Sequence, residues 1–343
     1  MTDSRTCSQV DFVITWVDGT DPAWRRERSA FATDGDGFGH SEARFREWGL
    51  LRYWFRGVEK FAPWVDKVHF VTWGHLPEWL DTAHPKLHIV NHRDFIPADY
   101  LPTFNTNAIE LNLHRIPGLS EQFVYFNDDV FLLDHTRPTF FFRKGAPRDF
   151  FCLDAPKFAT GTISHIVGED LAAINDNFQA EGIYAANRLK MLSLSLGWPR
   201  IRRNIVMRRL FRRFIPGFEN RHTFLAFRKA TFNDVWSTVG DRLDATCKHR
   251  FRGRLDMSDW LMRYWQLAKG NYFCGAPGVC RCAHLTSENA DVWAGRIKAR
   301  LYTALCANDN SLLEDFDAVR NKITAAFSAV LPEKCSFERK AVP

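Results

Sequence analysis

The stretch Asp11-Phe-Val-Ile-Thr-Trp-Val17 is a short run of apolar and strand-forming residues, and it ends in the polar turn Asp18-Gly-Thr-Asp-Pro22. A run of this length that is closed by a turn is typical of a buried β-strand. A similar run, residues 122–127, is followed directly by Asp128 and Asp129. Both segments are therefore predicted to be strands with acidic side chains at their ends.

Helices alternate with strands around these two segments. Further strands are expected at 67–72 and 86–90, helices at 23–31, 42–61, 77–80 and 107–114, and a loop at 33–39. Such alternation predicts an α/β fold with a largely parallel, Rossmann-like sheet. Ligands bind these sheets at the carboxyl ends of the strands, so the turns at Asp18 and Asp128 are predicted to form one site.

The second half of the chain is richer in helix. Helical segments are expected at 169–197, 231–243, 258–268 and 291–331, with a loop over 154–170. We expect residues 1–150 to form an α/β region and residues 151–343 to form a helix-rich region packed over its sheet. Because no linker or repeat separates the two, one integrated domain is predicted.

The bulk composition is that of an ordinary globular protein. The 343 residues carry a net charge of +6, and 45% of them are hydrophobic. This positive charge favours anionic partners, but it is too diffuse to indicate nucleic-acid binding. The polar N-terminus, the lack of an apolar run of ~20 residues and the scattered cysteines predict a cytoplasmic protein with reduced thiols.

One dense basic run, Arg200 to Arg213, interleaves arginines with apolar residues. It is consistent with a solvated helix face, and equally with a patch that contacts an anionic membrane or a polyanionic glycan. In the second case the protein would lie at the inner face of the cell membrane. Both interpretations stay open at this point.

Asp128 and Asp129 stand in an otherwise apolar stretch. Buried carboxylates are costly unless a cation or a hydrogen-bond donor compensates for them. Carboxylate oxygens are ligands of Mg²⁺ and Mn²⁺, and such a cation neutralises the diphosphate of a nucleotide-sugar. A capped turn is the alternative. The chain has neither a G-x-G-x-x-G fingerprint nor a P-loop, which disfavours a dinucleotide or ATP site.

Three further polar segments are candidates for the same site. Glu110 and His114 are four positions apart and would share a helix face, although a helix cap at Asn105 or Thr106 with a surface pair is the alternative. His222 and the arginines of residues 249–256 suit phosphoryl transfer. Arginine binds phosphate oxygens, and histidine accepts a proton near neutral pH.

Together these segments resemble the Stealth family. This family includes bacterial capsular-polysaccharide hexose-1-phosphotransferases and the catalytic subunit of lysosomal-enzyme GlcNAc-1-phosphotransferase. The blocks that carry the resemblance are Asp11–Thr20, the stretch from Arg44 to Asn127-Asp-Asp-Val-Phe131, Asn220-Arg-His222, Arg250–Asp256 with Trp260 and Tyr264, and the ending Pro332–Glu338. They extend over nearly the whole chain.

The resemblance implies a fold of the nucleotide-sugar transferase type and a reaction in capsular or cell-surface polysaccharide synthesis. Hexose-1-phosphate, above all GlcNAc-1-phosphate from UDP-GlcNAc, would pass to a glycan hydroxyl with release of UMP. The resemblance implies Mg²⁺ or Mn²⁺ at Asp128 and Asp129. It places Asp128, His222, Arg252 and Asp256 in the catalytic centre, and Thr15, Trp16, Val17, Asp18, Gly19, Arg46, Asn105, Glu110, His114 and Asn127 at the donor nucleotide-sugar.

Two assignments and two rival functions stay open. Arg250 is an alternative to Arg252 as the phosphate ligand, and either His222 or Asp128 can be the general base. A metal-dependent glycosyltransferase would use the same carboxylates but release a nucleoside diphosphate. A glycan-binding protein that uses its aromatic surface would turn over no nucleotide-sugar.

Overall fold

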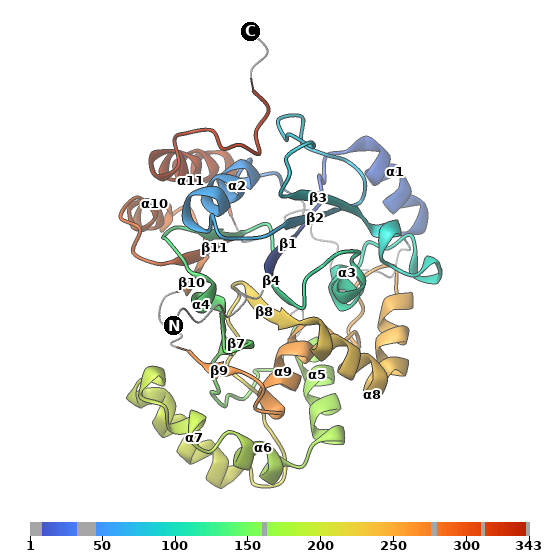
Figure 1. The fold of residues 1–343 in the computed structure, drawn as a ribbon, viewed down its shortest axis with the longest axis vertical. Coiled ribbons are helices and arrows are strands. Elements are labelled where there is room, and N and C mark those ends of the chain that lie inside the picture. The colour runs from blue at the N-terminus through green and yellow to red at the C-terminus, as the bar shows by residue number, and fades with distance from the viewer. Residues whose placement is uncertain (1–8, 33–45, 160–162, 276–279, 310–312, 341–343) are drawn as a thin grey trace, which may run out of the picture.

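The computed structural model describes residues 9–32, 46–159, 163–275, 280–309 and 313–340, and it is built around a five-stranded sheet (Figure 1). The strand order is β3-β2-β1-β4-β8. Neighbours among β1 to β4 pair in parallel, and β8 adds antiparallel to β4 at one edge. The bounds are Val10–Trp16 for β1, Val68–Thr72 for β2, Leu87–Asn91 for β3, Gln122–Phe126 for β4 and Leu225–Arg228 for β8. The prediction of an α/β fold with a largely parallel sheet is confirmed.

The register of β1 and β4 brings their polar ends to one edge of the sheet. Ile14 pairs with Phe126, so the residues that follow each of them leave the sheet side by side. The apolar residues before these ends alternate between the two faces of the sheet and are buried on both. The turn at Asp18 and the Asp128–Asp129 pair therefore project from neighbouring strands.

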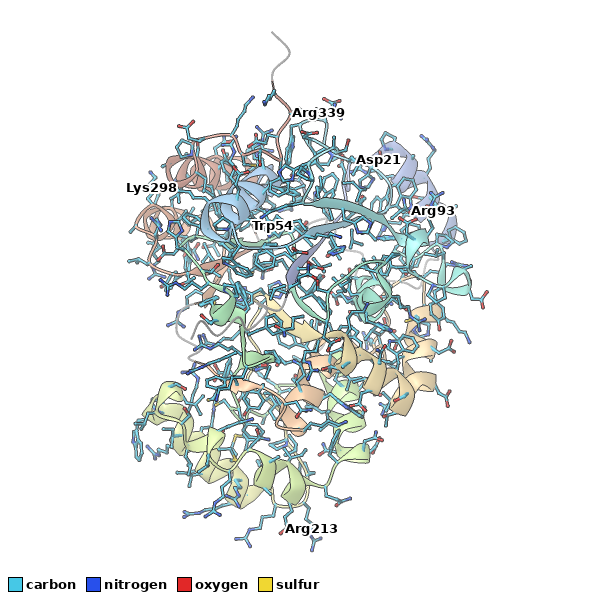
Figure 2. All side chains as sticks on the ribbon, in the orientation of Figure 1. Asp21, Trp54, Arg93, Arg213, Lys298 and Arg339 are labelled. Atoms are coloured by element: carbon cyan, nitrogen blue, oxygen red, sulfur yellow. The ribbon has the colours of Figure 1, made fainter. Side chains whose placement is uncertain are left out.

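Two hydrophobic cores cover the two faces of this sheet, and each draws on both halves of the chain. In the first core, Trp54 (labelled in Figure 2) packs with its ring centroid 5.6 Å from that of Phe126. The helices are α1 (Pro22–Phe31), α2 (Leu51–Phe61), α3 (Thr106–Leu111), α4 (Pro138–Phe141), α5 (Ser164–Asn177), α6 (Ala180–Ala186), α7 (Trp198–Leu210), α8 (Lys229–Lys248), α9 (Trp260–Ala268), α10 (Ala290–Lys298) and α11 (Phe316–Val330). The predicted boundary between an α/β region (residues 1–150) and a helix-rich region (residues 151–343) remains a proposal.

Two smaller sheets flank the central one. In the first, β11 (Ala304–Asn308) lies between β10 (Cys280–His284) and β5 (Val130–Leu132). The second joins β6 (Phe142–Arg143), β7 (Ala146–Asp149) and β9 (Phe273–Cys274). Because β11 pairs with β5, the C-terminal part of the chain reaches the turn that carries Asp129.

Several local predictions were wrong in part. The helix expected over 42–61 begins only at Leu51, because Gly49 has a φ of +69° that a helix does not adopt; residues 33–45 lie outside the described part. Residues 77–80 form a turn, and α5 begins inside the loop expected over 154–170. The helical stretch expected over 291–331 contains β11, which is too short for its periodicity to separate strand from helix.

Glu219 holds the segment before β8 in place. Its carboxylate accepts hydrogen bonds from Arg200, Arg203 and Arg221. Burial opposes ionisation of this carboxyl, but the arginines, Arg200 first, outweigh burial and lower its pKa to about 2. A carboxylate whose pKa is lowered by folding stabilises the fold above its unfolded pKa of about 4.5, and loses that effect as the pH falls toward 2.

We expect Glu219→Gln to lower the free energy of unfolding at pH 7 by about 2 kcal/mol, the electrostatic difference after allowance for solvent screening. Urea unfolding followed by circular dichroism from pH 7 to pH 2.5 measures it. The gap between wild type and variant should shrink below pH 4.5. Glu78→Gln, at an exposed position, is the matched control and should change little. A gap that persists unchanged at pH 2.5 would contradict this explanation.

Candidate active site

The acidic pair lies in the turn between β4 and β5, at the carboxyl edge of the central sheet. Oδ2 of Asp129 lies 3.2 Å from Nε2 of His222 and accepts a hydrogen bond from the Cys306 thiol at 3.2 Å. Burial favours the neutral form of Asp129, but these two partners lower its pKa below the usual value. Burial also opposes protonation of His222, but Asp129 raises its pKa to about 9. The two side chains therefore form an ion pair at neutral pH.

Asp128 differs from its neighbour in electrostatics. Its side chain is accessible to solvent, yet it is closely surrounded by protein atoms and lies near two other carboxylates. Burial, followed by the charges of Asp129 and Glu47, raises its pKa to about 7. Three acidic groups this close repel one another, and a cation bound among them would relieve that repulsion.

The donor atoms at this turn fit a divalent metal ion. Oδ1 of Asp129 is buried and has no hydrogen-bond partner among the described residues, so it is available as a ligand. One ligand atom each of Asp129, His222 and Cys306 lies within 4.8 Å of the other two. Asp128 and Asp129 offer the oxygen ligands that Mg²⁺ and Mn²⁺ prefer, while imidazole and thiol are also ligands of softer metals.

The Tyr125 hydroxyl links the predicted donor-binding residues to the acidic turn. It lies 2.8 Å from Oε1 of Glu110, 2.7 Å from Oδ1 of Asn127 and 2.9 Å from Oγ1 of Thr15. Burial raises the pKa of Glu110, and Arg252 offsets part of that effect. Thr15, Glu110 and Asn127, which are far apart in the sequence, therefore meet at one point beside Asp128.

Arg252 and Arg250, the two candidates for the phosphate ligand, have different partners. Arg252 interacts electrostatically with Glu110 and Asp259. Arg250 instead donates a hydrogen bond to the Pro102 carbonyl. Of the two arginines that the sequence left open, the structure favours Arg252. Asp259 was missed by sequence reasoning; burial first, then the charge of Glu110, raises its pKa well above the usual value.

Asp256 is held by hydrogen bonds to Asn105 and to the loop that carries Arg252. It is fully buried, and it accepts hydrogen bonds from Asn105 Nδ2 at 2.7 Å and from the Gly253 amide at 2.9 Å. Its other oxygen lies 2.7 Å from Nδ1 of His249. Because both of its oxygens have protein partners, the structure favours a positioning role for Asp256 and Asn105, in which they fix the loop that carries Arg252.

Two predicted donor-binding residues, His114 and Arg46, have partners outside this cluster. His114 is buried against α8, where its ring stacks 5.3 Å from Phe232, and burial first lowers its pKa to about 3. Its structural surroundings favour packing over ligand binding. Arg46 has its guanidinium 3.9 Å from Asp309, just after β11, and 5.3 Å from the ring centroid of Phe316.

The turn that follows β1 lies at the same edge of the central sheet as the acidic turn, next to it. Asp18 accepts hydrogen bonds on Oδ1 from the amide and hydroxyl of Thr20, and its own amide donates to Nε2 of His75. The Trp16 ring stacks on Phe70, and the buried Gly19 follows Val17 and Asp18 in the tight turn. Asp18 also raises the pKa of Glu47, after burial, so it lies near the residue that raises the pKa of Asp128.

The chain matches models of two regions of Stealth proteins, conserved region 1 over residues 8–36 and conserved region 2 over residues 44–149. It is 36% identical to the capsular polysaccharide phosphotransferase WcwK of Streptococcus pneumoniae, over 98% of this chain and 100% of that one. The chain belongs to the Stealth family. It is also 36% identical to the receptor polysaccharide phosphotransferase WefC of Streptococcus gordonii, over 96% of this chain and 99% of that one. This Stealth protein is accordingly an enzyme, a phosphotransferase.

Solved structures that resemble this Stealth protein are more distant. The galactosyltransferase LgtC in complex with donor and acceptor sugar analogues has a TM-score of 0.40 at 12% identity, over 93% of this chain and 95% of that one. Mouse xyloside xylosyltransferase 1 in its apo form has a TM-score of 0.36 at 10% identity, over 88% of this chain and 98% of that one.

Proposed function

We propose that this Stealth protein transfers hexose-1-phosphate, with GlcNAc-1-phosphate from UDP-GlcNAc as the expected donor group, to a glycan hydroxyl and releases UMP. The single observation that carries the proposal is the Asp129–His222 pair, at 3.2 Å, beside Asp128 at the carboxyl edge of the sheet. It combines a proton acceptor with carboxylates suited to a cation at a diphosphate. Full-length similarity to capsular and receptor polysaccharide phosphotransferases supports the same class of reaction.

The donor would lie across the ends of β1 and β4. The turn formed by Trp16, Val17, Asp18 and Gly19 is assigned to the nucleotide, and Thr15, Glu110 and Asn127, joined through Tyr125, to the sugar phosphate side. Arg252 supplies positive charge to the phosphate oxygens, a role for which its planar fork is suited. Arg46 remains a proposed donor contact from the opposite side of the turn.

His222 is assigned as the general base. Nε2 faces Asp129, so an Nε2–H that donates to this carboxylate leaves Nδ1 to accept the proton of the attacking hydroxyl. A carboxylate that orients an imidazole in this way also stabilises the imidazolium that forms. Mg²⁺ or Mn²⁺ at Asp128 and Asp129 would neutralise the diphosphate and offset the acidic charge that raises the pKa of His222.

The identity of the released nucleotide tests this proposal. Purified enzyme is incubated with UDP-GlcNAc, Mg²⁺ and a glycan extract, and the products are separated and identified by mass. Release of UMP with a phosphate-bearing sugar product is expected, because the anomeric C–O bond stays intact while the P–O bond to the nucleoside phosphate breaks. Release of UDP instead would identify a glycosyltransferase and overturn the proposal.

Removal of divalent cations should abolish turnover. EDTA is expected to reduce UMP release below detection, and excess Mg²⁺ or Mn²⁺ should restore it, because the charge of the diphosphate is otherwise unopposed. Differential scanning fluorimetry in the same buffers shows whether the fold survives chelation. Full activity after exhaustive chelation would contradict a metal-dependent mechanism.

We also propose that the face around α7 contacts an anionic membrane. Among the described residues no helix is long and apolar enough to cross a bilayer, but this face exposes large apolar side chains: Leu189 (83%), Leu194 (90%), Trp198 (71%) and Leu210 (70%). Arginines 202, 208, 209, 212 and 213, in α7 and just after it, are exposed as well, and Figure 2 shows Arg213 at the opposite end of the molecule from Arg339. Ile201, by contrast, packs inward.

Vesicle sedimentation tests this contact. The protein should pellet with phosphatidylglycerol vesicles, less so with phosphatidylcholine vesicles, and salt should weaken the binding because the arginines contribute by electrostatic attraction. Leu194→Ser and Arg209→Glu should each reduce the bound fraction several-fold. Leu301→Ser, at another exposed leucine, is the matched control. Equal pelleting with both lipids, or no response to salt, would contradict the proposal.

A further inference from the structure

A cavity of about 230 Å³ lies beside the catalytic histidine. Arg221 and Thr223, the two chain neighbours of His222, both line it, and Trp260 in its wall directly follows Asp259. The wall is formed by α4, β7, β8, α9, β9 and β10 and the residues next to them: Phe140, Arg148, Asp149, Phe150, Arg221, Thr223, Phe224, Leu225, Ala226, Trp260, Arg263, Gly275 and Cys280. None of these residues belongs to the donor site described above.

The cavity and the proposed nucleotide site lie on opposite sides of the acidic turn. In the strand order β2-β1-β4-β8, the turn carrying Asp18 follows β1, whereas the cavity is lined by Leu225 of β8. Leu225 pairs with Tyr125, so the start of β8 reaches the same edge as Asp128. Phosphoryl transfer places the attacking and leaving oxygens roughly in line on opposite sides of phosphorus. A leaving nucleotide on the β1 side therefore requires the attacking hydroxyl to come from the β8 side.

The charges in the wall show which group is available to a ligand. Arg263 is saturated, because it forms two hydrogen bonds to Asp149, at 2.8 and 2.9 Å, and a third to Asn220. Arg221 is paired with Glu219. Arg148 donates from Nη1 to the Thr139 carbonyl, but its Nε is buried and has no hydrogen-bond partner in the part of the chain that the structure describes. A buried donor without a partner is costly, and a rotation of the Arg148 side chain toward the cavity would let an oxygen of a ligand satisfy it.

The size and the remaining wall suit a sugar ring. Binding pockets for drug-sized ligands measure roughly 300–1,000 Å³, so a cavity of about 230 Å³ matches one small polar ring better than an oligosaccharide. The rings of Phe140, Phe224 and Trp260 give apolar surface for the C–H faces of a pyranose, while Arg148 offers a donor for its oxygens.

We propose that this cavity binds the sugar residue of the acceptor glycan that carries, or adjoins, the attacking hydroxyl, and that Arg148 donates a hydrogen bond to an oxygen of that sugar. The assignment rests on the proposed function, since it presumes a glycan acceptor. It gives the protein separate sites for its two substrates, on the two sides of His222.

Ligand-observed NMR with defined probes tests the assignment without turnover. Saturation transfer from the enzyme to methyl glucoside, methyl galactoside, methyl N-acetylglucosaminide and methyl glucuronoside is measured at millimolar probe concentration. At least one probe should bind, and Arg148→Gln should weaken it about tenfold, as expected when one hydrogen-bond donor to a ligand is lost. If the glucuronoside binds more tightly than the glucoside, the group that accepts from Arg148 is a carboxylate. If the two probes bind equally, that group is a hydroxyl.

Controls separate this site from the donor site. Arg188→Gln, at an exposed position away from the cavity, should leave probe binding unchanged. UMP binding at the donor site, followed by calorimetry, should be the same in Arg148→Gln and wild type. If wild type binds none of the four probes, or if Arg148→Gln binds them as well as wild type, the cavity assignment is overturned. A failure of wild type to release UMP from UDP-GlcNAc in the presence of Mg²⁺ and the glycan extract would instead overturn the proposed function.

Discussion

Replacement of Asp129 by asparagine is expected to lower kcat for UMP release by at least about 10²–10³-fold while the protein stays folded. Removal of one group that stabilises charge in a transition state typically has an effect of this size. Asparagine keeps the shape and one hydrogen-bonding oxygen of aspartate. It lacks the negative charge that attracts a cation and that raises the pKa of His222. The variant should therefore also bind Mn²⁺ more weakly, which paramagnetic relaxation of water protons measures.

Asp134→Asn provides the matched control for this variant. Asp134 is close in sequence and forms an ion pair with Arg300, but it is half exposed and lies outside the site. Its replacement should change kcat by less than about twofold, as is usual for exposed ion pairs. Asp128→Asn should behave like Asp129→Asn, since the two carboxylates are proposed to share one cation. Unchanged turnover in both would refute the assignment of the metal site.

The central sheet could be predicted from the sequence because its signals are local. The run that becomes β1 and the run that becomes β4 are each read from a few consecutive residues, and the parallel register then brings Asp18 and Asp128 to one edge. His222 could be placed at this edge only through the family resemblance. No local signal shows that β8 adds to β4 in the opposite direction.

Cys306 and Asp259 were missed because their neighbours in space are remote in sequence. Cys306 is separated from Asp129 by 177 positions and reaches it only through the pairing of β11 with β5. A signal was present, since Asn308-Asp309 follows an apolar run as Asn127-Asp128 does. With β11 assigned to a helical stretch, this second strand end went unrecognised.

His114 shows where spacing misleads. Its four-residue separation from Glu110 predicts a shared helix face, but α3 ends at Leu111 and a 3₁₀ turn over Leu113–Arg115 follows. The change of helical period turns His114 toward α8 and leaves Glu110 at the site. Asp256, which the resemblance assigns to the catalytic centre, is buried with partners on both oxygens, and a catalytic carboxylate and a buried structural one have the same sequence signature.

His222→Gln should lower kcat by about 10²–10⁴-fold, the range associated with loss of a general base. A base acts only when it is deprotonated. In wild type, kcat/KM should therefore rise with pH, with a midpoint between the ordinary histidine pKa of 6.5 and the value of about 9 that Asp129 imposes on His222 without a bound cation. The rise should be absent in His222→Gln, because glutamine does not titrate.

The variant also decides between the two candidate bases. If Asp128 accepts the proton, the pH profile of His222→Gln keeps the rising limb, whereas that of Asp128→Asn loses it. The midpoint alone does not separate the two candidate bases, because the pKa of Asp128, about 7, falls within the range expected for His222. His135→Gln, at an exposed histidine that packs against Phe61, is the control and should keep both the limb and the rate. A rising limb that survives in His222→Gln would assign the role of base to Asp128. The group that still titrates would then be the Asp128 carboxyl, whose pKa is raised by burial and by Asp129.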